Sequence, residues 1–121
     1  MTRDPHPSGD HREAAVTIRP MHRDDVPTIV AIEQQSFSDP WSALTFRSAL
    51  TRPHTRASAA VDPDGRPCGY CVLLHVLDEG EIANIAVDPA RRGRGIAGRL
   101  LDDALAAAGQ LELSRVFLEV R

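Results

Sequence analysis

The residues of this chain that could bind a phosphate lie together, where an expected strand gives way to an expected helix. Arginine and small residues alternate there, in Arg92-Gly93-Arg94-Gly95-Ile96-Ala97-Gly98. Residues with little or no side chain let an anion approach the backbone, and the first N–H groups of a helix are unpaired and carry partial positive charge. The stretch therefore predicts a cradle for a phosphate or pyrophosphate. A flexible turn whose glycines serve only helix packing is the alternative.

The same letters contain Gly93-x-Gly95-x-x-Gly98, the spacing of the dinucleotide-binding fingerprint, and Glu119 follows further along. That fingerprint comes almost directly after its strand and opens a domain of several parallel strands. Here residues 88–92 intervene, most of the chain precedes the motif, and only one expected strand follows it. A nicotinamide dinucleotide site is therefore not expected.

Composition narrows the chemistry further. All 14 Lys and Arg residues of the 121-residue chain are arginine, which excludes a lysine nucleophile or Schiff base. The formal net charge of −3 argues against nucleic-acid binding as the main function. No apolar stretch reaches the ~20 residues of a membrane span, and the N-terminus lacks the apolar run of a secretion signal. A cytoplasmic protein is therefore expected.

The two cysteines form the pattern Cys68-Gly-Tyr-Cys71, which raises the alternatives of half a zinc site, a redox pair or a disulfide. Zinc would need two further ligands, and the sequence has no second pair of this kind. The pattern falls in an expected strand, where residues three apart point to opposite faces. We therefore predict reduced cysteines packed in the core, and no metal site.

Hydrophobic patterning predicts a disordered tail over residues 1–15 and one α/β domain over residues 16–121. Strands are expected at 16–19, 56–61, 68–77, 81–87 and 115–121. Helices are expected after the N-caps Asp24 and Ser42, and after the Arg/Gly stretch, with Gly109 as the C-cap of the last. Short connections between the second, third and fourth strands favour antiparallel neighbours. The expected architecture is a mixed, mostly antiparallel sheet with helices on both faces.

The pattern Arg92-x-x-Gly95-x-Ala97 after a strand resembles the acyl-CoA motif of the GNAT superfamily of N-acetyltransferases. Other stretches resemble more closely the bacterial members that acetylate the N-terminal alanine of a small-subunit ribosomal protein. These stretches are Ile32-Glu33-Gln34, Pro40-Trp41-Ser42, residues 84–89 and Leu118-Glu119-Val120-Arg121. The resemblance runs from about Val16 to Arg121. It implies a GNAT fold and transfer of an acetyl group from acetyl-CoA to a protein N-terminus, without a metal.

Carried over residue by residue, the resemblance implies a site between the fourth and fifth strands. Backbone groups of the fourth strand would bind the pantetheine arm, and the Arg/Gly stretch would hold the pyrophosphate. Glu119 matches the proposed general base, which would take a proton from the acceptor amine. The implied coenzyme-binding residues are Ile85, Ala86, Val87, Arg92, Gly93, Arg94, Gly95, Ala97 and Gly98.

The chain departs from the family pattern at its C-terminus. Family members continue with a helix and further strands, which carry an Asn that contacts the coenzyme and a Tyr that protonates the departing thiolate. The single tyrosine of this chain, Tyr70, lies in the third expected strand and does not match that role. The resemblance thus implies a domain that lacks the final strands, for which weak activity and association through an open strand edge are expected. The alternatives are an enzyme for small-molecule amines and a non-catalytic acyl-CoA-binding protein.

Overall fold

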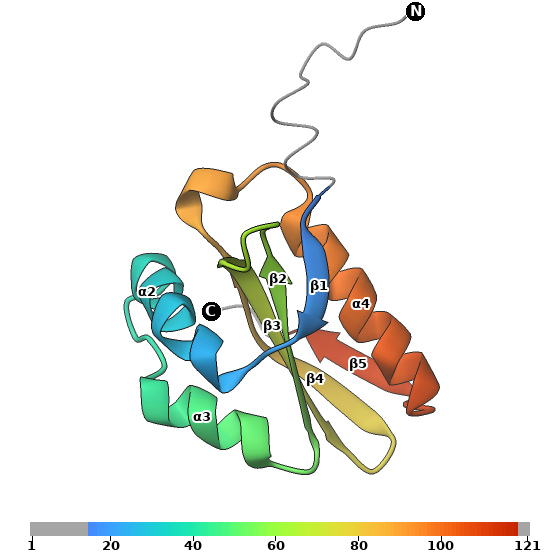
Figure 1. Cartoon of the computed structure of the whole chain (residues 1–121). Helices are drawn as coiled ribbons and strands as arrows, with labels where there is room; N and C mark the ends of the chain where they lie inside the picture. The colour runs from blue at the N-terminus through green and yellow to red at the C-terminus, as the bar shows by residue number, and fades with distance from the viewer. Residues whose placement is uncertain (1–14, 119–121) are drawn as a thin grey trace, which may run out of the picture.

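A five-stranded mixed sheet forms the centre of the molecule (Figure 1). The computed structural model describes residues 15–118. In order across the sheet, the strands are β1 Thr17–Pro20, β2 Thr55–Val61, β3 Pro67–Val76, β4 Glu79–Val87 and β5 Arg115–Leu118. Neighbours from β1 to β4 are antiparallel, whereas β4 and β5 are parallel. The expected mixed, mostly antiparallel α/β architecture is confirmed.

Helices cover both faces of this sheet (Figure 1). On one face lie α2 Val26–Ser36 and α3 Ala43–Thr51, and on the other lies α4 Ile96–Gln110. Two short 3-10 helices, η1 Arg23–Asp25 and η2 Pro89–Arg91, precede α2 and follow β4. Among residues 15–118, no helix has the length and apolarity needed to cross a membrane.

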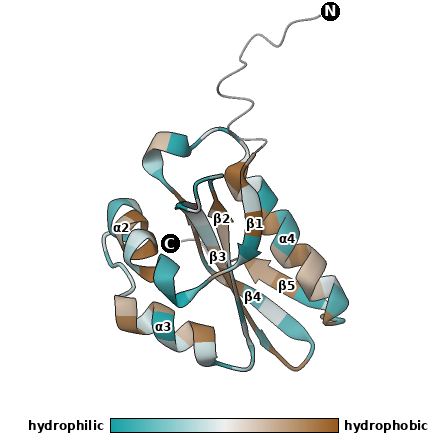
Figure 2. Ribbon diagram, in the orientation of Figure 1, coloured by the Kyte–Doolittle hydropathy of each residue, from teal (hydrophilic) through white to brown (hydrophobic). Residues whose placement is uncertain are grey.

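The sheet separates two hydrophobic cores, because alternate residues of each strand face opposite helices. Apolar residues recur at helical spacing on the inner face of α4, as the brown bands of the helices in Figure 2 show. The core under α4 contains Val16, Ala60, Cys68, Cys71, Leu73, Ile82, Val87, Ile96, Leu100, Ala104 and Ala108. The core under α2 and α3 contains Met21, Val26, Ile29, Ile32, Phe46, Ala59, Val61, Tyr70 and Val72.

The two cysteines are free and buried, as expected, but they lie on the same face of the sheet. The reason is a β-bulge: Ala60 pairs with Gly69 and Val61 with Pro67, so Cys68 is the extra residue on β3. An extra residue shifts the alternation of side chains by one. The argument that residues three apart must face opposite ways was therefore wrong for this strand, although the packed, reduced state it supported is confirmed.

Helix starts agree with the sequence at one position and differ at another. Ser42 caps α3 as expected, since its hydroxyl accepts a hydrogen bond from the backbone N–H of Thr45 at 3.1 Å. The cap of α2 is Asp25 and not Asp24. The short η1 turn moves the start of α2 along the chain, and Asp25 is held there by Arg19 at 2.8 Å.

The end of α4 also differs from the sequence expectation. Gly109 lies inside the last turn, and the helix ends at Gln110 with Leu111 as its C-cap. The helical hydrogen bonding continues past the glycine, because the N–H of Leu111 donates to the carbonyl of Ala107. The left-handed residue that turns the chain is Glu112, with a φ of 59°.

Burial makes both thiols unreactive in the folded protein, and this can be measured. Burial, reinforced by the nearby charge of Asp103 and opposed by that of Arg56, raises the pKa of Cys71 to about 12. At pH 8 only about one Cys71 in ten thousand is then a thiolate, the form that reacts. We expect Ellman's reagent to leave the native protein unmodified and to titrate two thiols after unfolding in guanidinium. Prompt reaction of one thiol in the native protein would contradict this packing.

Candidate functional site

One edge of β4 is open where the sheet would otherwise continue. The pairing of β4 with β5 covers Glu79 to Ile82, which lies opposite Leu118. Beyond that point, residues 83–87 have no strand partner on this side within the described part of the chain. A bulge at Ala83, between the pairs Val72–Asn84 and Leu73–Ile82, bends β4 at the same place. Among the described residues, this stretch of β4 thus has an edge with which a ligand could pair as a strand does.

Hydrogen-bond direction decides which backbone groups reach this open edge. The N–H of Asp88 donates to the carbonyl of Cys68 on β3, at 2.8 Å. Because backbone groups alternate along an antiparallel strand, Ala86 also faces β3, whereas Ile85 and Val87 point away from it. Of the three residues expected to offer backbone groups, Ile85 and Val87 are thus oriented to do so, and Ala86 is not.

The Arg/Gly stretch forms a cavity at the end of this strand. After η2, Gly93 and Gly95 take left-handed conformations, with φ of 79° and 84°, that side chains disfavour. They turn the chain sharply so that α4 begins at Ile96, directly beside the end of β4. The cavity has a volume of about 340 Å³ and is lined by Val87, Arg91, Arg92, Gly93, Gly95, Ile96 and Ala97.

The first turn of α4 borders this cavity, whose lining includes Ile96 and Ala97. The N-cap is Gly95, which has no side chain that could accept hydrogen bonds from the first N–H groups of the helix. The helical ladder starts with the N–H of Arg99, which donates to the carbonyl of Gly95 at 3.1 Å. The N–H groups of Ile96, Ala97 and Gly98 thus precede the ladder, at the positive end of the helix dipole. This arrangement suits an anion such as a pyrophosphate.

The arginines of the stretch have different roles. Arg91 is 8% exposed, and its Nη1 contacts both carboxylate oxygens of Asp62, at 2.8 and 3.0 Å. Arg92 donates from Nε to the carbonyl of Val87 at 3.0 Å and from Nη2 to the hydroxyl of Ser36 at 2.8 Å. Both side chains therefore hold the loop against the rest of the fold. Arg92 has two donors engaged with protein, and Arg94 is exposed.

The predicted general base, Glu119, lies outside the described residues, directly after Leu118. Its role remains a prediction from the resemblance. Tyr70 is fully buried and donates from its hydroxyl to Glu33, which agrees with the expectation that it is not the general acid.

A buried polar cluster around Glu33 was missed by the sequence reasoning, although Glu33 and Asn84 lay within the stretches that carried the resemblance. Glu33 is 0% exposed, and its carboxyl oxygens accept hydrogen bonds from Tyr70, from Asn84 and from the backbone of Trp41. One signal was available: Glu33 follows Ile29 by four residues, so it falls on the buried face of α2.

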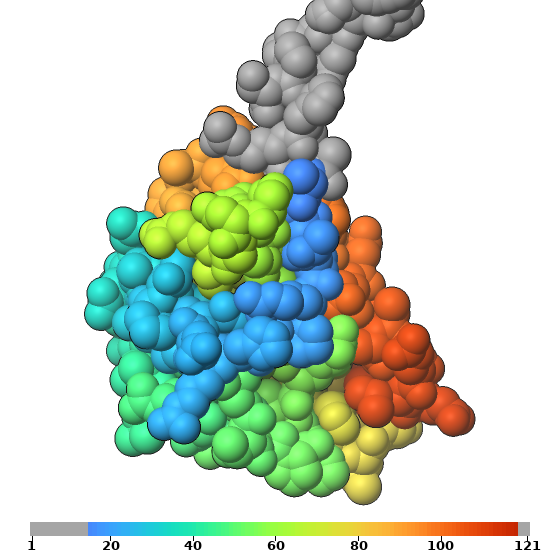
Figure 3. Space-filling view, in the orientation of Figure 1, coloured from blue at the N-terminus to red at the C-terminus, as the bar shows by residue number. Residues whose placement is uncertain are grey.

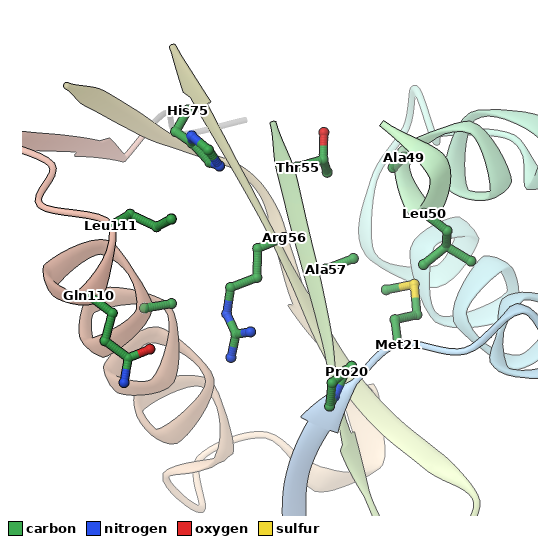
Figure 4. Close-up of a pocket in the computed structure, with 11 residues that line it drawn as sticks. Pro20, Met21, Ala49, Leu50, Thr55, Arg56, Ala57, His75, Gln110 and Leu111 are labelled. Carbon is green, nitrogen blue, oxygen red and sulfur yellow. The ribbon is translucent and has the colours of Figure 1, made fainter. Parts of the chain in front are cut away.

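A second and larger cavity, of about 450 Å³, lies away from these residues (Figure 4). It wraps around β2 beyond the end of β1, so that Arg56 points toward α4 while Ala57 lies toward Leu50 and Met21. The guanidinium of Arg56 is paired with Asp103 at 2.8 Å. None of the residues predicted for the site lines this cavity, and it has no helix N-terminus. The smaller cavity is therefore the candidate site.

Comparison with known proteins shows the family to which the chain belongs. The sequence model of the acetyltransferase (GNAT) family matches residues 26–121. The Escherichia coli ribosomal protein bS18-alanine N-acetyltransferase is 30% identical over 105 residues, which cover 87% of this chain and 70% of the relative. The Mycobacterium tuberculosis N-alpha-acetyltransferase RimI is 36% identical over 113 residues, covering 88% and 68%.

Solved structures of similar sequence also have a similar fold. The crystal structure of the E. coli ribosomal-protein-S18-alanine N-acetyltransferase has a TM-score of 0.78 at 29% identity, covering 88% of this chain and 67% of that one. A Mycobacterium tuberculosis protein crystallised in complex with CoA has a TM-score of 0.74 at 33% identity, covering 84% and 63%.

The ion pair between Arg91 and Asp62 should contribute measurably to stability. The turn between β2 and β3 that carries Asp62 lies near the top of the face shown in Figure 3, beside the loop that follows β4. Asp62→Asn removes the charge that faces buried Arg91, and we expect the free energy of unfolding to fall by about 1–3 kcal/mol. Asp64→Asn, the same change in the same turn at an exposed position, should stay within about 0.5 kcal/mol. Equal losses in urea unfolding of the two variants would show that the pair does not hold the loop.

Proposed function

Because the chain belongs to the GNAT family of acetyltransferases, we propose that it transfers the acetyl group of acetyl-CoA to the N-terminal α-amine of a protein. The acceptor we propose is the N-terminal alanine of a small-subunit ribosomal protein. One observation carries the proposal: an open strand edge at Ile85 and Val87 leads directly to an anion-binding turn at the start of α4. The names of the relatives support the class of acceptor.

In the proposed complex, acetyl-CoA continues the sheet. Its pantetheine arm takes the place of a strand along β4, pairing with the backbone of Ile85 and Val87. Its pyrophosphate binds the first N–H groups of α4, and Arg94 adds positive charge nearby. Arg92, Gly93 and Gly95 shape the turn, while Ala97 and Gly98 leave room for close approach of the phosphates. The acetyl group then lies beside the bulged part of β4.

The proposed reaction is a direct transfer with no enzyme-bound acetyl intermediate. The amine nitrogen attacks the thioester carbonyl carbon, a C–N bond forms, and the C–S bond breaks as the thiolate departs. A backbone N–H of the open edge would stabilise the negative charge on the carbonyl oxygen. An α-amine has a pKa of roughly 7.7–8.0, so much of it is protonated at neutral pH and needs a base. We assign this role to Glu119, directly or through a water molecule.

A peptide-acetylation assay tests the proposal. The protein, acetyl-CoA and a peptide that begins with alanine should give a product one acetyl group heavier, located by mass spectrometry on the α-amine. Glu119→Gln should lower kcat/KM by about 10²–10⁴, with recovery at higher pH as the free amine becomes abundant. Modification of small amines but not of the peptide would reassign the acceptor, and binding of acetyl-CoA without any turnover would indicate a non-catalytic protein.

A pair of glycine variants tests the location of the coenzyme. Gly98 and Gly109 lie at opposite ends of α4, and a Cβ added at either would meet no atom within 4 Å. We expect Gly98→Val to raise the Kd of acetyl-CoA at least tenfold, a loss of about 1.4 kcal/mol, while Gly109→Val leaves it unchanged. Gly95→Val is less suitable, because the left-handed backbone adds strain of roughly 1–2 kcal/mol.

Calorimetric titration measures both variants, with NAD as a ligand that should not bind the wild-type protein. Tight binding of acetyl-CoA to folded Gly98→Val would place the cradle elsewhere, and measurable affinity for NAD alone would remove the basis of the proposal.

A further inference from the structure

A buried carboxyl group of α2 joins several elements near the open edge of β4. Oε1 of Glu33 accepts hydrogen bonds from the Tyr70 hydroxyl and from Nδ2 of Asn84, the latter at 2.9 Å. Oε2 accepts from the backbone N–H of Trp41, also at 2.9 Å. These partners come from β3, from β4 and from residues 37–42, here called the α2–α3 segment. A single side chain of α2 therefore connects three other parts of the fold.

Stability alone does not explain such a cluster. Taking a carboxyl group out of water is costly, and well-packed apolar residues are often at least as stabilising as a buried polar group with its partners. What hydrogen bonds add is direction, because each donor must lie within about 3 Å of its oxygen and nearly in line with it. The cluster thus fixes the distances between α2, β4 and the α2–α3 segment more closely than apolar packing would.

Two of the partners of Glu33, Asn84 and the α2–α3 segment, are connected to the candidate site. Asn84 directly precedes Ile85, whose backbone points to the open edge of β4. The α2–α3 segment begins after Ser36, whose hydroxyl accepts from Nη2 of Arg92 in the anion-binding turn, at 2.8 Å. Near its end lies Trp41, whose backbone N–H donates to Glu33 and whose ring packs on Phe46 with ring centroids 5.3 Å apart. The segment is therefore tied to the site at its start and to Glu33 at its end.

The place of the segment suggests what it positions. In the proposed complex, the coenzyme occupies the β4 edge and the turn at the start of α4. The acceptor must reach the thioester from the side that the coenzyme leaves free. On the face of the sheet opposite α4, α2 packs over β3 and β4 (Figure 1), and the α2–α3 segment continues from the end of this helix.

We propose that Glu33 is a positioning residue, which holds the α2–α3 segment at a set distance from β4 so that the acceptor amine meets the thioester. The inference rests on the proposed function. Glu33 is buried and touches no substrate, so its effect passes through Trp41 on the acceptor side and through Asn84 on the coenzyme side.

Glu33→Gln is the main variant, because it keeps the shape of the side chain and leaves one acceptor oxygen instead of two. The remaining side-chain oxygen can still accept from Tyr70 and Asn84. The new NH2 group then lies opposite the backbone N–H of Trp41, and two donors cannot form a hydrogen bond with each other. We expect the KM for an alanine-initiated peptide to rise about tenfold, with the Kd of acetyl-CoA within twofold of the wild type.

A second readout needs no turnover. Trp41 is the only tryptophan of the chain, so its fluorescence reports on the α2–α3 segment alone. Glu33→Gln should free the segment, and quenching of this fluorescence by acrylamide should increase.

Tyr70→Phe is the matched control, since it removes the hydroxyl that donates to Glu33 and keeps Trp41 and Asn84 as partners of that carboxyl group. We expect it to lower the melting temperature while peptide KM and acrylamide quenching stay as in the wild type. If Glu33→Gln does not fold, Asn84→Ala tests the other connection. The Kd of acetyl-CoA should be about tenfold higher for Asn84→Ala than for Tyr70→Phe. Equal Kd values for the two variants would overturn the proposal.

Two results in folded Glu33→Gln would also overturn it: unchanged quenching of Trp41, or increased quenching with an unchanged peptide KM. The same changes in the control Tyr70→Phe would overturn it as well. A wild-type protein that binds acetyl-CoA but never acetylates a peptide would count against the proposed function instead. The quenching comparison would still show whether Glu33 holds the segment.

Discussion

The structure depends on a strand that is paired along one edge and open along part of the other. β4 follows β3 over its whole length, which holds its backbone in place, whereas within the described residues β5 pairs with it only from Glu79 to Ile82. An unpaired edge usually invites association with another chain. Here the open part is short, is bent by a bulge at Ala83, and ends at the Arg/Gly turn. A ligand that offers both strand-like polar groups and a phosphate fits that combination.

The surrounding elements keep this edge in a fixed position. On one face of the sheet, Ile96 and Leu100 anchor α4 in the core, so the donors of its first turn stay next to the end of β4. On the other face, Glu33 ties α2 to Asn84 within the strand. Arg92 closes the arrangement, because it contacts both the last carbonyl of β4 and the end of α2. The edge is thus held by packing on one side and by directed hydrogen bonds on the other.

Arginine side chains and the start of α4 place positive charge around the candidate site in two different roles. Arg91 is nearly buried and paired with Asp62, and Arg92 is bound to protein groups, so these two arginines shape the loop. In the proposed complex, the attraction for the pyrophosphate then comes mainly from the backbone N–H groups at the start of α4. A rigid loop loses little freedom when a ligand binds, which favours donors from the backbone over long flexible side chains.

The sequence by itself determined the order of strands and helices, the mixed sheet and the glycine-containing turn that precedes α4. These follow from local signals: hydrophobic periodicity, the cap at Ser42, and glycines at the two positions that require a left-handed backbone.

The sequence did not determine which side chains face one another. The shared face of Cys68 and Cys71 depends on a bulge set by pairing with β2, and the partners of Arg92 lie far away in the chain. The orientation of Ala86 away from the open edge follows from the register with β3. Glu33 illustrates the difference best: its place on the apolar face of α2 can be read from spacing, but Tyr70 and Asn84 meet it only when β3 and β4 pack against that helix, because contacts between distant segments are set by tertiary packing.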